Sequence, residues 1–230
     1  MLRSMAKVQD AEGYASPAMQ ERRKRILMVA RGLISDVGID GWSLAELGKQ
    51  AGVAKQTLYY AFGSREAVVA AAILDYFEEY EAAIPYHAAP GTIDRLIERI
   101  VGIGRRNLTI RNYVAALVTI YFGRSPELWE AMFAIASRPH RAAVDKLAER
   151  GDLQPWVDPQ ALADMMVGQT ILVANAWLQG RIADAEMIDR MAVAVLTELA
   201  GSVRAEARVG LENTIARIAA KGAERYVAAI

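Results

Sequence analysis

A short run of polar side chains offers the clearest chemistry in this sequence. Within six residues it holds an ammonium group, an amide and three hydroxyl groups: Lys55, Gln56, Thr57, Tyr59 and Tyr60. Lysine and hydroxyl groups donate hydrogen bonds to phosphate oxygens, lysine also donates to guanine, and glutamine pairs bidentately with adenine. These residue types in one run are typical of a surface that contacts nucleic acid.

Two short helices are predicted to position this run. Ser43 stands three residues before Glu46, which predicts a capped helix over 43–51. Glycine and valine at 52–53 predict a tight turn, followed by a second helix over 54–62. That second helix is about 12 Å long, close to the width of the DNA major groove. The apolar positions then face inward: Leu44, Leu47, Ala51, Val53, Leu58 and Phe62. The pattern favours a helix-turn-helix, and a generic helical hairpin remains the alternative.

Residues 26–69 carry an ordered set of matches to one known family. They read ILMVARGLISDVGIDGWSLAELGKQAGVAKQTLYYAFGSREAVV. This stretch resembles the N-terminal domain of the TetR family of bacterial repressors. Residues 149–201 are similar, more loosely, to the ligand-binding and dimerisation domain of the same family. The departures from the family pattern are Trp42, Gly48, Ala54 and Ala61, of which the last two remove a capping hydroxyl and a polar DNA contact.

The resemblance implies a role for each polar residue of this segment. Phosphate contacts are implied for four hydroxyl-bearing or cationic residues at helix ends: Ser43, Thr57, Tyr59 and Arg65. Base contacts are implied for three residues of the second helix: Lys55, Gln56 and Tyr60. The basic run at 22–25 is interpreted as a solvated helix face, and a phosphate contact from the first helix is the alternative.

Helical periodicity recurs along the whole chain, and no segment alternates convincingly with the period of a strand. We therefore expect an all-α fold with three parts. These are a flexible arm over 1–16, an N-terminal three-helix helix-turn-helix DNA-binding domain over 17–64, and a C-terminal helical ligand-binding and dimerisation domain over 65–230. Capping residues, glycines and prolines predict helices over about 17–37, 43–51, 54–62, 64–84, 92–108, 112–122, 125–150 with a kink or break near Pro139, 158–179 and 184–200 with Asp184 as its cap, and a last one from Val203.

The likeness to this family also implies a homodimer. A single reading head specifies few bases, so we expect two heads on a palindromic double-stranded DNA operator, with half-sites about one helical turn apart. The helices over 159–179 and 184–200 are implied to form the interface with their symmetry mates. Both are apolar over a wide arc, which burial inside one chain would also explain.

An effector pocket is implied among the helices over 92–180. Its candidate wall consists of aromatic, aliphatic and amide side chains: Tyr113, Leu117, Tyr121, Trp129, Phe133, Met166, Gln169, Thr170, Val173 and Trp177. Side chains of these types at helical spacing also form ordinary cores, which is the alternative. Because no acidic cluster or basic clamp stands out, we expect a neutral, largely apolar or aromatic small-molecule effector. Its binding would favour a dimer whose heads no longer fit successive major grooves.

The composition excludes several other classes of protein. The chain of 230 residues is 53% hydrophobic, with no cysteine and two histidines, so a disulfide scaffold and a thiolate metal site are excluded. It has no glycine-rich phosphate loop, HExxH or GxSxG motif, so we expect neither an enzyme nor a bound cofactor or metal. His140, Arg141 and Asp145 are interpreted as a surface ion pair rather than a catalytic site. A helical scaffold that does not bind DNA is the remaining alternative.

Charge and hydropathy suggest where the protein acts. The net charge is zero, but residues 1–70 carry ten Lys or Arg against seven Asp or Glu, an excess that suits nucleic-acid contact at one end. The N-terminus has no apolar signal segment. The longest uncharged stretch, 165–180, looks too short and too polar to span a bilayer. We therefore expect a cytoplasmic protein that does not bind membranes.

Overall fold

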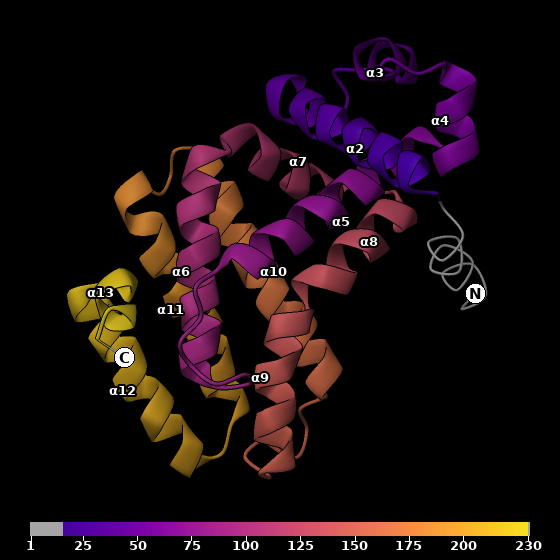
Figure 1. Cartoon of the computed structure of the whole chain (residues 1–230). Helices are drawn as coiled ribbons and strands as arrows, with labels where there is room; N and C mark the ends of the chain where they lie inside the picture. The colour runs from indigo at the N-terminus through magenta and orange to yellow at the C-terminus, as the bar shows by residue number, and fades with distance from the viewer. Residues whose placement is uncertain (1–15, 230) are drawn as a thin grey trace.

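The computed structural model describes residues 16–229 and confirms the all-α fold (Figure 1). Among these residues, the extended pairing is limited to one isolated antiparallel bridge between Leu153 and Val203. The predicted arm falls on residues 1–15, which lie outside the described residues, and on Ser16, the N-cap of the first helix. The helices are α2 (Pro17–Val37), α3 (Leu44–Ala51), α4 (Lys55–Phe62), α5 (Arg65–Ala83), α6 (Ile93–Thr109), α7 (Arg111–Phe122), α8 (Pro126–Ala136), α9 (Arg138–Glu149), α10 (Pro159–Leu178), α11 (Asp184–Ser202), α12 (Ala205–Lys221) and α13 (Ala223–Val227).

Several helices begin at the capping residues that the sequence predicts. In five cases the cap side chain accepts a hydrogen bond from the backbone amide three residues further on: Ser43, Ser64, Thr92, Ser125 and Asp158. Each bond satisfies an amide that has no partner within the first turn of its helix. The starts of α3, α5, α6, α8 and α10 are therefore set by local sequence.

The structure corrects one cap and settles one break. The N-cap of α11 is Ala183, not Asp184, which is the first helical residue. The carboxylate of Asp184 instead accepts a hydrogen bond from the indole of Trp177 at 2.7 Å. The break expected near Pro139 is confirmed, because α8 ends at Ala136 and α9 begins at Arg138. Proline has no amide hydrogen to donate, so it fits the first turn of a new helix better than the interior of a long one.

Helices α2, α3 and α4 form a head that projects from the rest of the molecule (Figure 1). α5 runs from this head into the body, and Arg31 of α2 pairs with Asp75 and Glu79 of α5 at 3.0 and 2.7 Å. One apolar cluster joins the head to α5, α7 and α8, and it includes Ile26, Leu47, Leu58, Ile73, Phe77, Tyr113 and Met132. The division of the chain at residue 64 therefore stays a prediction, since the head and the start of the body share a core.

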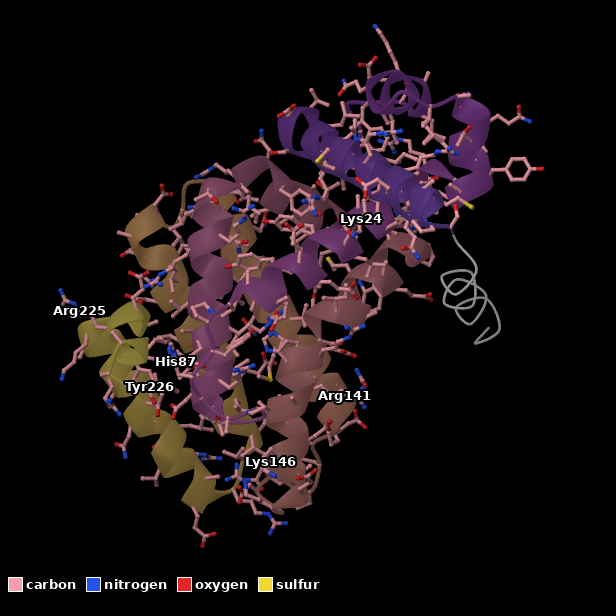
Figure 2. All side chains as sticks on the ribbon, viewed as in Figure 1. Lys24, His87, Arg141, Lys146, Arg225 and Tyr226 are labelled. Carbon is pink, nitrogen blue, oxygen red and sulfur yellow. The ribbon has the colours of Figure 1, made fainter. Side chains whose placement is uncertain are left out.

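A second apolar cluster fills the body. α11 lies at its centre and packs against α6, α10, α12 and α13. The two C-terminal helices cover α11 and α6 at the lower left of Figure 1. Tyr226 of α13, labelled in Figure 2, donates a hydrogen bond to Asp94 at the start of α6 at 2.7 Å. The C-terminal extension thus belongs to the packed body.

α10 differs from the sequence prediction in one respect. By length and composition alone, Pro159–Leu178 is long and apolar enough to cross a membrane, contrary to the expectation that this stretch is too short and too polar. A core helix passes the same test. α10 packs against α7, α8, α9 and α11, and its residues Leu162, Met166 and Trp177 are fully buried. The core therefore accounts for part of its apolar character, since 39% of its most apolar window is buried within the chain.

Candidate nucleic-acid interface and effector cavity

The turn between α3 and α4 is tight because two glycines permit it. Gly52 has a φ of 66° in the left-handed region, which side chains disfavour. A Cβ atom on Gly48 would lie 2.8 Å from the carbonyl oxygen of Val53, so this close approach requires a glycine or a small shift. Gly48 departs from the family pattern, and the structure supplies a steric reason for it.

Only half of the capping box at the start of α3 forms. The hydroxyl of Ser43 accepts a hydrogen bond from the amide of Glu46 at 3.2 Å. The carboxylate of Glu46 accepts from the amide group of Gln50 at 2.8 Å rather than reaching back to the cap. Ser43 itself is exposed, so its hydroxyl lies at the surface of the head. It is predicted to contact a phosphate there.

The predicted base-contacting residues all lie on the exposed side of α4. Leu58 is buried and holds the helix to the head, whereas Lys55 and Gln56 are exposed. Tyr60 is 89% exposed and Tyr59 48%, which is unusual for aromatic side chains of a folded protein. The ammonium group of Lys55 lies 5.6 Å from the ring centroid of Tyr59. We call these four exposed residues, together with the partly exposed Thr57, the outer surface of α4.

Arg65 is engaged by the protein itself. Its guanidinium donates hydrogen bonds to the backbone carbonyls of Ile39 and Trp42, with 3.3 Å between Nε and the oxygen of Trp42. It also lies 4.8 Å from the ring of Trp42 and 4.0 Å from the carboxylate of Asp40. These contacts hold the α2–α3 loop to the start of α5. The sequence did not reveal this role, because nothing local marks a cation that reaches carbonyls 23 and 26 residues away.

The basic run 22–25 is divided between two surroundings. Arg22 and Lys24 are exposed, as expected for a solvated helix face. Arg23 lies 4.6 Å above the ring of Phe62, and Arg25 donates to the carbonyl of Ala51 at 3.2 Å. The last two therefore brace α4 and the end of α3 against α2.

The sequence of this head matches a known protein family. Residues 26–72 match the family model described as bacterial regulatory proteins of the tetR family, and the match includes the whole helix-turn-helix. This match places the head, residues 26–72, in the TetR family. A curated relative, the HTH-type transcriptional repressor KstR of Rhodococcus jostii (strain RHA1), is 27% identical over 196 residues, which is 80% of this chain and 85% of the relative.

Solved structures show that this regulator shares its fold with the family well beyond the head. The TetR regulator TylP of Streptomyces fradiae superposes with a TM-score of 0.57 at 20% identity, covering 90% of this chain and 99% of the other. A TetR transcriptional regulator from Rhodococcus sp. RHA1 gives a TM-score of 0.59 at 21% identity, with coverages of 78% and 97%. The helical body and the head together therefore have the architecture of a TetR-family transcriptional regulator.

The two helices predicted to form the dimer interface differ in what they leave exposed. In α11 the apolar residues are buried within this chain, among them Met187, Met191, Val195 and Leu199. α10 leaves Met165 and Leu172 about half exposed, at 53% and 50%, and their spacing of seven residues places them on one face. Burial inside one chain, the alternative weighed for both helices, thus accounts for much of α11.

Several of the ten residues predicted to line an effector pocket are divided between the two apolar clusters, and their role in ligand binding stays a prediction. Tyr113, Leu117 and Phe133 belong to the cluster that includes the head, and Met166 and Trp177 belong to the cluster of the body. The ring of Phe133 stacks on two others, with its centroid 3.9 Å from that of Trp129 and 5.8 Å from that of Tyr121. Thr170 donates to its own helix at the carbonyl of Val167. Val173 packs at the edge of the body cluster.

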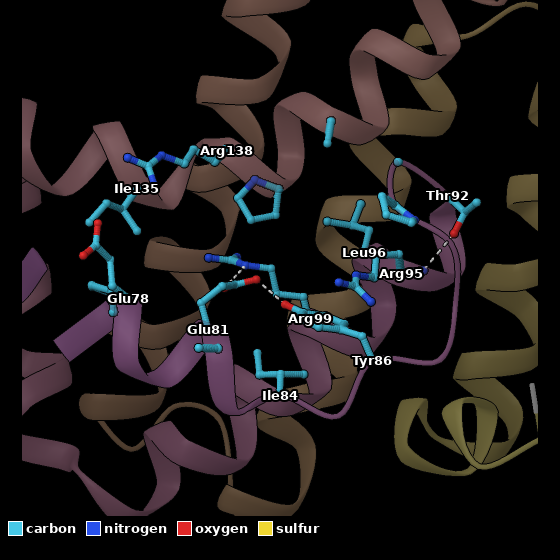
Figure 3. Close-up of a pocket in the computed structure, with 16 residues that line it drawn as sticks. Glu78, Glu81, Ile84, Tyr86, Thr92, Arg95, Leu96, Arg99, Ile135 and Arg138 are labelled. Atoms are coloured by element: carbon cyan, nitrogen blue, oxygen red, sulfur yellow. Dashed lines mark hydrogen bonds and ion pairs between the residues drawn. The ribbon is translucent and has the colours of Figure 1, made fainter. Parts of the chain in front are cut away.

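A cavity of about 700 Å³ lies elsewhere, between α5, α6, α8, α9 and the loop that joins α5 to α6 (Figure 3). None of the ten predicted residues belongs to its lining. Arg95 and Arg99 of α6, Glu78 and Glu81 of α5 and Arg138 of α9 supply its charged groups. Arg95 and Arg99 lie four residues apart, one turn along α6, so they share a face of this helix. This spacing is the one sequence signal that could have located the cavity.

Glu81 organises the polar side of this cavity. It accepts a hydrogen bond from Nε of Arg99 at 2.8 Å and another from the hydroxyl of Tyr86, as the dashed lines in Figure 3 show. Burial, and then the hydrogen bond to Glu81, raise the pKa of Tyr86 well above its usual value, so its hydroxyl stays protonated and donating. The guanidinium of Arg95 stacks on the ring of Tyr86 at 3.2 Å and donates to the carbonyl of Ala88.

His140 is buried next to this cavity and differs from the expected surface site. It is 1% exposed, and its Nδ1 has no hydrogen-bond partner among the described residues. Burial, and then the nearby positive charge of Arg99, lower the pKa of His140 to about 3, so the ring is neutral at physiological pH. Arg141 and Asp145, by contrast, form the expected exposed pair on α9, 3.9 Å apart. Arg141 is labelled in Figure 2.

Proposed function

We propose that this protein is a cytoplasmic repressor that binds a palindromic double-stranded DNA operator as a homodimer and leaves it when a small molecule binds. The observation that carries the proposal is the outer surface of α4, where Lys55, Gln56, Tyr59 and Tyr60 are exposed on a helix held by buried Leu58. A folded protein has no structural need for two exposed tyrosines on one short helix. Phosphates and base edges give all four side chains partners.

Repression rather than activation is supported by one relative. KstR, to which 80% of this chain aligns, is named a transcriptional repressor. A protein that occupies an operator as a dimer blocks it while bound, and a ligand that favours another arrangement of the heads lifts the block by shifting the population of dimers.

α5 gives the proposed ligand a physical route to the head. Its first residue, Arg65, holds the carbonyls of Ile39 and Trp42 in the head loop. Nearer its other end, Glu78 and Glu81 line the cavity. A ligand that displaces this end of α5 would therefore move the anchoring point of the head. We propose a ligand with a largely apolar or aromatic body, since apolar side chains form most of the cavity wall.

Two heads per dimer would bring the two α4 helices to successive major grooves. We propose that the exposed face of α10, defined by Met165 and Leu172, forms part of the contact between the two copies. An isologous interface places each of these residues against the same surface of the partner, so an apolar stripe on one helix is covered by its own copy.

The experiment is selection of binding sites from a random duplex library, followed by mobility-shift titrations on the selected sequence. We expect an inverted repeat, because a two-fold dimer reads each half-site in the same way. Lys55→Ala should weaken binding and lower the slope of log affinity against log salt by about one. Tyr59→Ala should also weaken binding, while Lys221→Ala, which removes an exposed lysine at the end of α12, should change neither quantity.

The proposal fails on either of two results. Recovery of no enriched sequence, with only salt-sensitive binding to any duplex, would show that the head does not read an operator. Unchanged affinity in both Lys55→Ala and Tyr59→Ala, with folded proteins by circular dichroism, would remove the outer surface of α4 from DNA recognition.

A further inference from the structure

We propose that the cavity between α5, α6, α8 and α9 binds an amphipathic small molecule with one carboxylate, and that this carboxylate pairs with the guanidinium of Arg99. The inference rests on the proposed ligand-released repressor and deepens it by naming the place and the chemical class of the ligand. It replaces the neutral ligand that the sequence alone favours, because the basic group of the cavity is assembled only by folding.

Arg99 is buried, and the terminal nitrogens of its guanidinium can still donate hydrogen bonds. The residue is 4% exposed, and its side chain lines the cavity. Glu81 accepts a hydrogen bond from Nε of Arg99. The terminal nitrogens of Arg99, Nη1 and Nη2, make no hydrogen bond to any described residue. These nitrogens are not among the fully buried atoms that lack a partner, and Arg99 lines the cavity, so an acceptor inside the cavity can meet them. Arg99 is thus fixed in position by one carboxylate while its terminal nitrogens stay available to another.

The guanidinium of Arg99 also has the right geometry for a carboxylate. Its planar arrangement of donors matches the two oxygens of a carboxylate, and such pairs form two parallel charge-assisted hydrogen bonds. Glu81 keeps Arg99 from rotating, and Tyr86 in turn holds the second oxygen of Glu81. A ligand carboxylate therefore meets a donor that is already oriented, so the Arg99 side chain loses little conformational entropy when the pair forms.

The charge of the cavity lining favours a ligand with one negative group. Arg95, Arg99 and Arg138 face Glu78 and Glu81, which leaves one positive charge in excess. Arg138 is exposed at the start of α9. His140, beside Arg99, is neutral and adds no charge. One negative group on the ligand balances the lining, whereas a cation would be repelled and a polyanion would meet the two glutamates.

Apart from Tyr86 and Thr92, the remainder of the cavity wall is apolar. Around the charged groups it includes Phe77, Ile84, Leu96, Ile135 and Pro139. A volume of about 700 Å³ lies in the range of pockets that enclose a small organic molecule. The ligand therefore has an aliphatic or aromatic body in addition to its carboxylate. This division into a charged end and an apolar body makes the ligand amphipathic.

The test measures binding to the full-length protein by isothermal titration calorimetry, without DNA. The probes are two matched pairs: 2-naphthoate with 2-naphthylmethanol, and octanoate with octan-1-ol. Each alcohol keeps the apolar body and loses the charge. We expect each carboxylate to bind roughly tenfold to hundredfold more tightly than its alcohol, because charge-assisted hydrogen bonds are lost with the carboxylate.

Three variants locate the carboxylate. Arg99→Gln should reduce carboxylate affinity to that of the alcohol and leave alcohol binding unchanged. Arg138→Gln, at an exposed position, should weaken carboxylate binding severalfold by removing a nearby positive charge. Arg141→Gln is the matched control, since it removes an exposed arginine three residues along α9 that is paired with Asp145 and does not line the cavity. It should bind all four probes as the wild type does.

Several outcomes overturn the inference. These are equal affinity for carboxylates and alcohols, no binding of either carboxylate at roughly 1 mM, or full carboxylate affinity in a folded Arg99→Gln protein. If Arg99→Gln does not fold, Arg138→Gln decides: weakened carboxylate binding supports the inference and unchanged binding overturns it.

Mobility shifts on the selected operator separate this inference from the proposed function. Arg99-dependent carboxylate binding that leaves the DNA complex intact would support the site and remove the ligand-release mechanism. A protein that selects an operator but binds no carboxylate would keep the DNA-binding function and overturn the site.

Discussion

The guanidinium of Arg65 lies 4.8 Å from the indole ring of Trp42 and donates a hydrogen bond to its backbone carbonyl at 3.3 Å. A second bond to the carbonyl of Ile39 fixes the same loop. The first residue of α5 thus holds the segment that leads into the helix-turn-helix. The position at which the family resemblance implies a phosphate contact also has a structural function inside the head.

Arg65→Ala should therefore lower the stability of the protein as well as its DNA affinity. Loss of hydrogen bonds from a charged donor to two backbone carbonyls should reduce the free energy of unfolding by about 1–3 kcal/mol. Urea unfolding followed by circular dichroism measures the change, with Arg22→Ala as a control because Arg22 is exposed on α2. Weaker DNA binding with unchanged unfolding would instead show that Arg65 acts only on the phosphate.

Leu172→Glu should convert the proposed dimer into a monomer. Leu172 and Met165 lie on one face of α10 and are about half exposed, and an isologous contact through this face would bury the new carboxylate of each copy against the apolar surface of the other. The mass in solution, measured by light scattering after size-exclusion chromatography, should fall by half. Val209→Glu is the matched control, since Val209 is 57% exposed on α12, away from this face. A dimer that survives Leu172→Glu would place the interface elsewhere.

Gly104→Ala should destabilise the packing of α6 on α11. A Cβ at Gly104 would lie 2.6 Å from Cγ1 of Ile188, so the side chain of Ile188 or one of the two helices must shift, at a cost of about 1–3 kcal/mol. Gly210→Ala is the matched control, because the same substitution there should raise stability. Nothing lies within 4 Å of a Cβ at Gly210 in α12, so alanine should raise stability by about 0.5–1 kcal/mol. Thermal unfolding of the two variants should shift in opposite directions, and a shift of both in the same direction would contradict the packing argument.

His140 should make the protein sensitive to acid. Its pKa is lowered from 6.5 to about 3 in the folded state, so between these values the unfolded chain binds a proton that the folded protein does not. The contribution of neutral His140 to the free energy of unfolding is therefore fully present above about pH 6.5. Below that pH the free energy of unfolding falls by about 1.4 kcal/mol for each pH unit. Between about pH 7.5 and pH 5 the loss should be about 2 kcal/mol. Urea unfolding of His140→Leu should show that much less acid sensitivity, and equal sensitivity in both proteins would refute the assignment.

Local sequence determined much of this protein. Side-chain caps such as Ser43, Ser64 and Asp158 act over three residues, so the starts of α3, α5 and α10 could be predicted from their neighbours. The helix-turn-helix is also local: the apolar spacing of 44–62 forces Lys55, Gln56 and Tyr60 outward once Leu58 is buried. These features need no knowledge of the distant chain, which is why the head and its outer surface could be predicted.

Tertiary structure alone decided the cavity and the anchoring of the head. Arg99 meets Glu81 across 18 residues, and Arg65 meets Ile39 across 26, and no local pattern marks either contact. Of the residues predicted to line a pocket, Tyr113 and Phe133 pack in one apolar cluster and Met166 and Trp177 in the other, since apolar side chains at helical spacing also form ordinary cores. Where charged groups from separate helices converge depends on how the helices cross, and that is fixed only when the cores are packed.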